Sequence, residues 1–158
     1  MDMAAQESGV DDTRPTDGNG PAFPVVMELG KFREFVRATR GTDGYSRRPD
    51  AVTPPTFLSV FLHWAPPDAL PYTRQGLEAD RVLHGGREFV FSGPPPKVGA
   101  RLTAQQRVEK TYTKTGRRGG TMRFVVALTE FRDESGHVVA EMRNTTIETG
   151  RPALEEES

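Results

Sequence analysis

Histidine is the side chain best suited to proton transfer near neutral pH, and this chain has three: His63, His84 and His137. No two of them stand at the spacing of metal ligands, so the sequence predicts no metal site. The chain has no cysteine, which excludes thiolate zinc sites, iron–sulfur clusters and cysteine nucleophiles. His137 follows Gly136 in a predicted turn and is expected to be exposed. For His84 we favour a structural hydrogen bond to a loop, with catalysis as the alternative.

Basic side chains gather around a predicted hairpin in the second half of the chain. They are Lys110, Lys114, Arg117, Arg118 and Arg123. Residues 23–149 hold 19 Lys and Arg against 14 Asp and Glu, about +5, whereas the whole chain carries −1. This excess is compatible with a phosphate-bearing partner, and a solvated basic face explains it equally well. The near-neutral whole predicts no nucleic-acid partner. The motifs GxxxxGK[ST], GxGxxG, GxSxG and HExxH are all missing from the sequence.

The chain of 158 residues is long enough for one domain with a core. Residues 1–22 hold five acids and a single base, with almost no large apolar residue, so we expect a disordered acidic tail there. Residues 150–158 are expected to form a second acidic tail, which leaves 23–149 as the folded domain. The longest apolar stretch is too short to span a membrane, and the N-terminus lacks signal-peptide features. A cytoplasmic protein without a membrane partner is expected.

The first half of the folded part alternates between short elements and breakers. Ala22–Glu28 is rich in β-formers and predicts a short strand. Lys31–Arg40 predicts a helix, because its apolar residues recur at helical spacing. Residues 41–55 contain several glycines and prolines and predict a loop.

Thr53–Ala65 predicts a second helix, with Thr53 as its N-cap and prolines in its first turn. Its apolar side chains surround the helix almost completely. They are Phe57, Leu58, Val60, Phe61, Leu62 and Trp64. A helix that is apolar on all sides is expected to be buried.

The second half predicts four long strands separated by turn signals. Their ranges are 81–92, 100–115, 120–131 and 137–149. Alternation is clearest in the third, where Met122, Phe124, Val126 and Leu128 share one face. Short connections between the last three predict an antiparallel meander. An apolar helix and a twisting antiparallel sheet together predict an α+β hotdog fold, in which the sheet wraps around the buried helix. The long edge strand predicts pairing with a second copy or a similar chain.

Several segments together resemble the N-terminal MaoC-like dehydratase domain family, whose members are hotdog proteins of enoyl hydration and 3-hydroxyacyl dehydration. The matching segments are KFREFVRAT, VTPPTFLSVFL, VLHGGREFVFSGPPPKVGARL and TEFRDESGHVVAEMRNTTIETG, which together span about residues 23–149. The sequence is also similar to the mycobacterial Had-type 3-hydroxyacyl dehydratases and the two-chain MaoC hydratases of steroid side-chain degradation. In both, the resemblance implies, one hotdog subunit carries the catalytic pair and the other mainly shapes the acyl channel.

The sequence departs from this family where its active members carry a G-D-x-N-P-x-H loop. The Asp and His of that loop orient and polarise the water that adds across the double bond. The corresponding residues here are Gly41-Thr42-Asp43-Gly44-Tyr45-Ser46-Arg47-Arg48. Asp43 stands one position late, and Arg47 or Arg48 occupies the place of the His. We therefore expect no catalytic dyad in this chain, with Asp43 and His84 as weak candidates.

The resemblance also implies a substrate-binding segment at the predicted buried helix. The helix N-terminus would face the thioester carbonyl of the substrate, where backbone N–H groups and the helix dipole polarise it. Plain core packing is the alternative. The candidate substrate-binding residues are Pro54, Pro55, Thr56, Phe57, Phe61, His63 and Trp64. For His63 a core position with a satisfied hydrogen bond is the favoured interpretation. Lys114, Arg117, Arg118 and Arg123 are candidates for the phosphates of coenzyme A or a phosphopantetheinyl carrier protein.

The sequence therefore predicts a subunit of an enoyl-thioester hydratase or 3-hydroxyacyl-thioester dehydratase that forms the acyl channel of a two-chain enzyme. No cofactor is expected, because the acyl-CoA or acyl carrier protein thioester is itself the substrate. Two alternatives stay open: a self-sufficient homodimeric hydratase that uses Asp43 or His84, and a non-enzymatic acyl-CoA-binding protein. The predicted partners are the acyl thioester and either a second copy or a catalytic MaoC-like chain.

Overall fold

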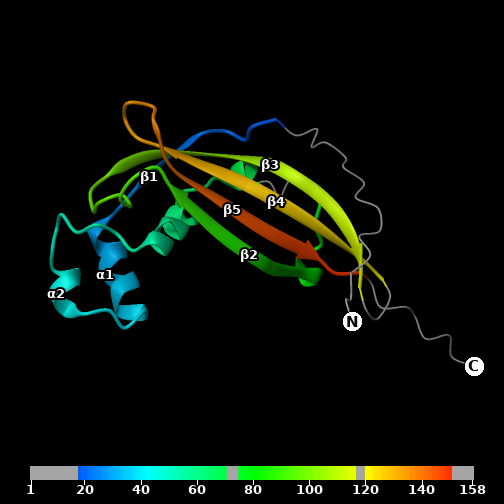
Figure 1. The fold of residues 1–158 in the computed structure, drawn as a ribbon, viewed down its shortest axis with the longest axis horizontal. Coiled ribbons are helices and arrows are strands. Elements are labelled where there is room, and N and C mark those ends of the chain that lie inside the picture. Colours follow the sequence, from blue (N-terminus) through cyan, green and yellow to red (C-terminus); the bar gives the residue numbers. More distant parts are fainter. Residues whose placement is uncertain (1–17, 71–74, 117–119, 151–158) are drawn as a thin grey trace, which may run out of the picture.

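Five antiparallel strands form one sheet in the order β1-β3-β4-β5-β2. The computed structural model describes residues 18–70, 75–116 and 120–150. The strands are β1 (Phe23–Val26), β2 (Val82–Phe91), β3 (Arg101–Thr115), β4 (Thr121–Arg132) and β5 (Val138–Glu148). The helices are α1 (Leu29–Ala38), α2 (Asp43–Ser46) and the 3₁₀-helices η1 (Pro55–His63), η2 (Pro67–Ala69) and η3 (Ala79–Arg81). Figure 1 shows the long strands running the length of the molecule, with α1 and α2 at one end.

The sheet turns one face toward η1, and alternation along the strands decides which side chains lie there. Ala104, Phe131 and Ala140 stand opposite one another on β3, β4 and β5, and all three are fully buried. One extra residue interrupts β3 at Glu109 and β2 at Gly85, since the register shifts at both points. Such bulges bend a strand and increase its twist, which helps a sheet to curve around a helix. The α+β hotdog fold predicted from the sequence is confirmed.

The central helix differs from the predicted α-helix over Thr53–Ala65, because it is the 3₁₀-helix η1. Three residues per turn place every third side chain in one row. Phe57, Leu58, Val60 and Phe61 occupy two rows and are buried. The third row contains Leu62, which is 44% exposed, so the expectation that the helix is buried all round is wrong for this row.

Thr53 does not cap the helix as predicted. Pro54 is the N-cap residue of η1 and offers no side-chain cap. Thr53 is instead buried, and both its N–H (2.9 Å) and its hydroxyl (2.7 Å) donate to the carbonyl of Pro96. These bonds, next to the bridge between Val52 and Lys97, tie the start of η1 to the segment before β3.

Aromatic rings join η1 to α1 and to the sheet. Phe57 contacts Phe32 and Phe35 of α1 edge-on, with ring centroids 5.9 and 5.4 Å apart. Phe61 contacts Phe131 of β4 edge-on at 5.7 Å and stacks on Phe23 of β1 at 6.2 Å. The predicted helix at Lys31–Arg40 is thus confirmed as α1, slightly shifted, and its apolar face packs against η1.

Two further details depart from the sequence expectations. Residues 41–55, predicted as loop, contain the short helix α2, whose Tyr45 hydroxyl donates to the carbonyl of Val52. The predicted tails, 1–22 and 150–158, lie mostly outside the described residues. Gly20, inside the first of them, is buried and its N–H donates to the Gln106 carbonyl at 2.7 Å, so the ordered chain includes this residue.

Among the described residues, no helix has the length and apolar character needed to cross a membrane.

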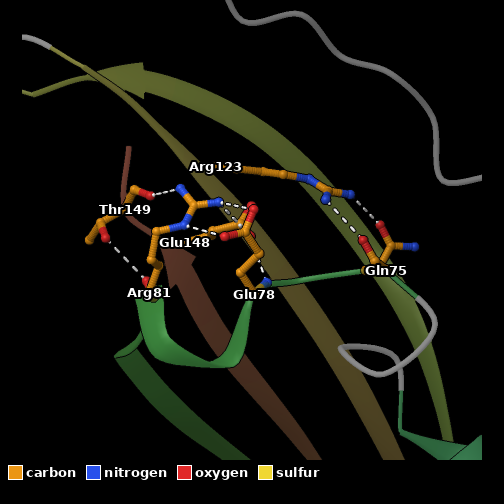
Figure 2. A network of polar contacts seen from close by, with 6 residues as sticks. All are labelled: Gln75, Glu78, Arg81, Arg123, Glu148 and Thr149. Carbon is orange, nitrogen blue, oxygen red and sulfur yellow. Dashed lines mark hydrogen bonds and ion pairs between the residues drawn. The ribbon is translucent and has the colours of Figure 1, made fainter. Parts of the chain in front are cut away.

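The segment before β2 is fastened to the ends of β4 and β5 by a polar network (Figure 2). Arg81 pairs with Glu78 at 2.7 Å and with Glu148 at 3.4 Å, and it donates to the Thr149 carbonyl. The Glu78 N–H donates to Glu148 Oε1 at 2.8 Å. The hydrogen bond with the Glu78 carboxylate raises the pKa of Arg81, so its positive charge is secured. Arg123 of β4 donates twice to Gln75 in the same segment, at 3.0 and 2.8 Å.

Candidate functional site

A cavity of about 90 Å³ lies between the C-terminal half of η1 and the sheet face that η1 covers. Its apolar lining includes Phe61 and Leu62 of η1 and Leu70 just beyond η2. The sheet contributes residues from four strands. They are Arg87 of β2, Gln106 of β3, Val125 and Ala127 of β4, and Met142, Asn144 and Thr146 of β5. The cavity therefore combines apolar walls with several polar side chains that point from the sheet toward η1.

Arg87 stands at the mouth of the cavity and is exposed. Its Nε and Nη2 donate to Asn144 Oδ1 at 3.2 and 3.0 Å, and its Nη1 donates to Ser59 Oγ at 2.9 Å. Ser59 belongs to the outward row of η1, which explains how it reaches the edge strand. These bonds hold the guanidinium across the opening between η1 and β2.

Among the side chains that the structure describes, no carboxylate pairs with Arg87 to balance its charge. Its hydrogen-bond acceptors, Asn144 and Ser59, are neutral. Burial by the surrounding protein lowers the pKa of Arg87, because removal of water disfavours the charged form. The mouth of the cavity therefore carries the positive charge of Arg87, whose hydrogen-bond acceptors are neutral. This charge suits the binding of an electron-rich oxygen atom.

Gln106 lies deeper in the cavity and is only 4% exposed. Its Nε2 donates to Thr129 Oγ1 at 2.7 Å, on the neighbouring strand. Its Oε1 is buried and has no hydrogen-bond partner within the described ranges. A buried acceptor left without a donor costs about 1–3 kcal/mol, and most such groups in native proteins have a partner. This oxygen has almost no accessible surface, so it is not open to the cavity, and Arg87 supplies the hydrogen-bond donors at the mouth.

The predicted substrate-binding residues separate into four groups. Phe61 lines the cavity. Phe57 is fully buried against α1, so it shapes the core rather than the cavity. Pro54, Pro55 and Thr56 form the N-terminal end of η1, at the opposite end from Leu62.

The last two predicted substrate-binding residues lie where η1 ends. His63 is exposed, against the favoured expectation of a core position, and its ring contacts that of Trp64 edge-on at 6.2 Å. Trp64 is half-buried and packs on the edge of the core. Neither side chain lines the cavity described above.

The two weak catalytic candidates lie in different parts of the fold. His84 is exposed on β2 and stands opposite Thr146 of β5, next to the bulge. Asp43 begins α2, and its side chain lies outside the described part of the chain. Figure 1 shows α2 at one end of the sheet and the start of β2 toward the other end. One chain therefore does not bring these two residues together. His137 is exposed in the turn before β5, as expected.

The basic cluster around the β3–β4 hairpin does not form one surface. Lys114 stands opposite Met122, whereas Arg123 is the next residue along β4, so their side chains leave opposite faces of the sheet. Lys114 Nζ lies 5.5 Å from the ring centre of Tyr112, and Arg123 is held by Gln75 on the other face. Arg117 and Arg118 lie outside the described residues.

Within residues 18–70, 75–116 and 120–150 no three His, Cys, Asp or Glu side chains gather as metal ligands. The polar side chains that line the cavity carry a guanidinium, two amides and one hydroxyl, which suit hydrogen bonding to an organic ligand.

Sequence reasoning did not single out Arg87, Gln106, Asn144 or Ser59. One signal was present in the sequence: Gln106 and Asn144 occupy strand positions where alternation with Ala104 and Met142 calls for core residues. A polar residue in an apolar alternation is a candidate site residue. Arg87 follows the glycine pair of HGGREF, two positions before Phe89, so the same alternation applies to it.

Comparison with known proteins assigns the family. A family model described as "FAS1-like, dehydratase domain region" matches residues 22–142, most of the chain. The chain belongs to this family. One relative of the chain, a UPF0336 protein of Streptomyces griseus, is 31% identical to it over 123 residues. These residues cover 72% of this chain and 78% of the relative.

Solved structures share the fold of this FAS1-like dehydratase-region protein. The HadBC (3R-hydroxyacyl-ACP dehydratase) complex of Mycobacterium tuberculosis matches with a TM-score of 0.62 at 19% identity, covering 84% of this chain and 98% of that chain. The ChsH1–ChsH2 complex of the same organism matches with a TM-score of 0.64 at 14% identity, covering 87% and 91%. The predicted family resemblance is confirmed, because the dehydratase-region family model covers most of the chain and the solved structures share its hotdog fold.

Proposed function

We propose that this chain is a subunit of an enoyl-thioester hydratase or 3-hydroxyacyl-thioester dehydratase, and that it shapes the acyl site while a second hotdog chain supplies the catalytic Asp and His. In this reaction the hydroxyl of water adds to C3 of a 2-enoyl thioester and its remaining proton goes to C2, or the reverse. The observation that carries the proposal is the family match combined with the altered loop, in which Thr42 stands in place of the Asp of the active family pattern and Arg47 or Arg48 in place of the His.

The arrangement within one chain supports the absence of a complete catalytic pair. His84 lies on β2 at the end of the sheet away from α2, where Asp43 is found. General acid–base catalysis requires the two groups within hydrogen-bond reach of the same substrate. A second chain is therefore needed to complete the site under this proposal.

The free edge of β2 is the proposed place for that second chain. β2 pairs with β5 on one side only and ends the sheet, so its outer edge can extend the sheet into another hotdog. Arg87 belongs to this strand and stands at the cavity mouth. A partner paired along β2 would thus flank the mouth with its own loops. Both solved structures described above are complexes of two named chains, which is consistent with this arrangement.

The N-terminal end of η1 is the proposed contact for the thioester carbonyl. Pro54 and Pro55 have no N–H, and the Phe57 N–H donates to the Pro54 carbonyl at 2.9 Å. Thr56 is exposed and is the remaining candidate donor of this turn. Lys114, Arg117, Arg118 and Arg123 remain the proposed contacts for the phosphates of coenzyme A or a carrier protein. Arg123 shares the sheet face of Val125 and Ala127, which line the cavity, whereas Lys114 leaves the opposite face.

Complementation tests the proposal. The chain is expressed alone and together with a hotdog protein that has an intact G-D-x-N-P-x-H loop and is encoded beside it, and crotonyl-CoA hydration is measured. We expect the two chains to copurify, and the pair to hydrate crotonyl-CoA at least about a hundredfold faster than this chain alone, since general acid–base groups contribute about 10²–10⁴-fold. A partner chain that is fully active alone, and is unaffected by this chain, would contradict the proposal. Binding of acyl-CoA without turnover in the pair would favour the non-enzymatic alternative.

A further inference from the structure

β3 is much longer than the strand beside it, so one of its edges is only partly covered by the described chain. On one side β4 pairs with β3 from Thr103 to Thr115. On the other side β1 pairs with it only from Arg101 to Ala104. Beyond Gln106, no described residue pairs with this second edge. Unpaired backbone N–H and C=O groups along a strand are a ready site for another extended segment.

The chain before β1 is fixed against this edge at one point. The Gly20 N–H donates to the Gln106 carbonyl at 2.7 Å, and Gln105 Nε2 donates to the Gly20 carbonyl at 3.0 Å. Because β1 and β3 are antiparallel, the chain that precedes β1 heads toward the far end of β3, as its blue trace shows in Figure 1. Residues 107–115 of β3 span about 30 Å, and a segment as long as residues 1–17 reaches up to about 55 Å when extended. Residues 1–17, which precede the described chain, are thus long enough to cover this edge.

The side chains on this part of β3 are mostly basic. Arg107, Lys110 and Lys114 lie on the outer face of the sheet, opposite the face that lines the cavity. The acid among them, Glu109, pairs with Arg143 at 3.1 Å. Within the described ranges, no carboxylate forms an ion pair with the three bases. The uncovered edge therefore lies beside three positive charges that are not balanced.

Residues 1–17 carry the opposite charge, since they contain five acids and one base, a net charge of −4. We propose that this acidic segment lies along the free edge of β3 and covers Arg107, Lys110 and Lys114. The segment has few residues that favour strands, and Pro15 has no N–H to donate, so charge contributes more to this docking than a regular ladder of hydrogen bonds. The edge of β2 is then the one left open for a second chain. A phosphate group that reaches Lys114 has to displace the segment.

Two other occupants fit this edge less well. Residues 151–158 hold three acids and one base, which is half the net charge of residues 1–17. They follow Gly150, which lies against Thr121 at the hairpin end of the strand, not along its free edge. A second copy of β3 would bring its own bases against those of the first, and like charges on paired strands repel one another.

A spin label on the full chain tests the docking. Because the sequence has no cysteine, Val10→Cys provides a single attachment point ten residues before Gly20. The nitroxide broadens the NMR signals of nearby amides, and its reduced form gives the reference intensities. We expect it to broaden the amide signals of residues 107–115 at low salt. Their intensity should recover at least about twofold in 1 M NaCl, where charges are screened beyond about 3 Å.

A charge reversal on the docking edge should act in the same way as salt. We expect Lys110→Glu to reduce the broadening, because it places an acid beside the acidic segment. Lys97→Glu is the matched control, since Lys97 is also exposed but precedes β3, at the other end of the strand. Broadening that responds neither to salt nor to Lys110→Glu overturns the proposal. Broadening that is equal along the edges of β2 and β3 overturns it as well.

Two further samples separate the other occupants. Leu154→Cys carries the label in the C-terminal segment, and broadening of residues 107–115 from this position but not from Val10→Cys overturns the proposal in favour of that segment. The second sample mixes spin-labelled protein without ¹⁵N with unlabelled ¹⁵N protein. Broadening of residues 107–115 in this mixture shows contact between molecules and overturns the proposal in favour of a second copy. Broadening confined to the Val10→Cys molecule itself supports the docking.

Discussion

Gly30 and Gly41 have different surroundings, and this difference predicts opposite effects of the same substitution. A Cβ added at Gly30, in the first turn of α1, meets nothing within 4 Å. We expect Gly30→Ala to stabilise the protein by about 0.5–1 kcal/mol, because alanine loses less backbone entropy in a helix. Denaturant unfolding measures the change, which should appear as a higher midpoint with an unchanged slope.

Gly41 follows α1, and a Cβ there would lie 2.6 Å from Val36 Cγ1 and 3.2 Å from the Val36 carbonyl oxygen. Val36 is 3% exposed and packed in the core, so it has little room to move away. Gly41→Ala should therefore destabilise the protein by about 1–3 kcal/mol, as for other overpacked sites. Equal unfolding midpoints for the Gly41→Ala and Gly30→Ala proteins would show that Gly41 does not lie as close to Val36 as described.

The three rows of side chains along η1 predict that two large apolar residues of this helix contribute differently to the stability of the protein. Phe57→Ala should cost about 3–5 kcal/mol, since its ring is fully buried between Phe32 and Phe35. Leu62→Ala, on the outward row at 44% exposure, should change stability by less than about 1 kcal/mol. Thermal unfolding of both variants measures this. A comparable loss from Leu62→Ala would favour the α-helix predicted from the sequence, with burial on all sides.

Glu148 connects β5 to the segment before β2, so its substitution tests how firmly this segment is attached to the sheet. Its side chain is 13% exposed, accepts from the Glu78 N–H at 2.8 Å and pairs with Arg81. We expect Glu148→Ala to lower Tm by roughly 2–6 °C and to speed hydrogen exchange at the Glu78 amide, because that bond is lost. Glu148→Gln keeps an acceptor oxygen and should have the smaller effect on exchange. The prediction is wrong if exchange at Glu78 is the same in Glu148→Ala as in the wild type.

The strands could be predicted from the sequence because alternation and turn residues are local signals. The ranges expected for β3, β4 and β5 end within one or two residues of those observed. The 3₁₀ character of η1 could not be predicted in the same way, because four apolar residues, Phe57, Leu58, Val60 and Phe61, fit a period of 3.0 as well as 3.6 over so short a stretch.

The candidate site could be predicted only in part, because it is assembled from residues far apart in the chain. Arg87 meets Asn144 because β2 pairs with β5, although most of the sheet lies between them in the sequence. It meets Ser59 because the outward row of η1 faces the edge strand. The sequence shows each residue type but contains no local signal for sheet order, so Phe61 was predicted and Arg87 was not.

The whole molecule has one open sheet edge beside its cavity, and this arrangement links the fold to the proposed function. β2 closes the sheet on the side where Arg87 stands, whereas β1 is a short strand at the far side. A partner along β2 would both cover the edge and add side chains at the mouth of the cavity.

Turnover by the isolated chain tests the central claim most directly. The purified full-length protein is assayed for hydration of crotonyl-CoA and a longer 2-enoyl-CoA, with its folded state confirmed by thermal unfolding in the same buffer. The account predicts no hydration above the rate in buffer, because it assigns the catalytic Asp and His to a second chain. Robust turnover by the lone protein, lost on Asp43→Ala or His84→Ala, would contradict it.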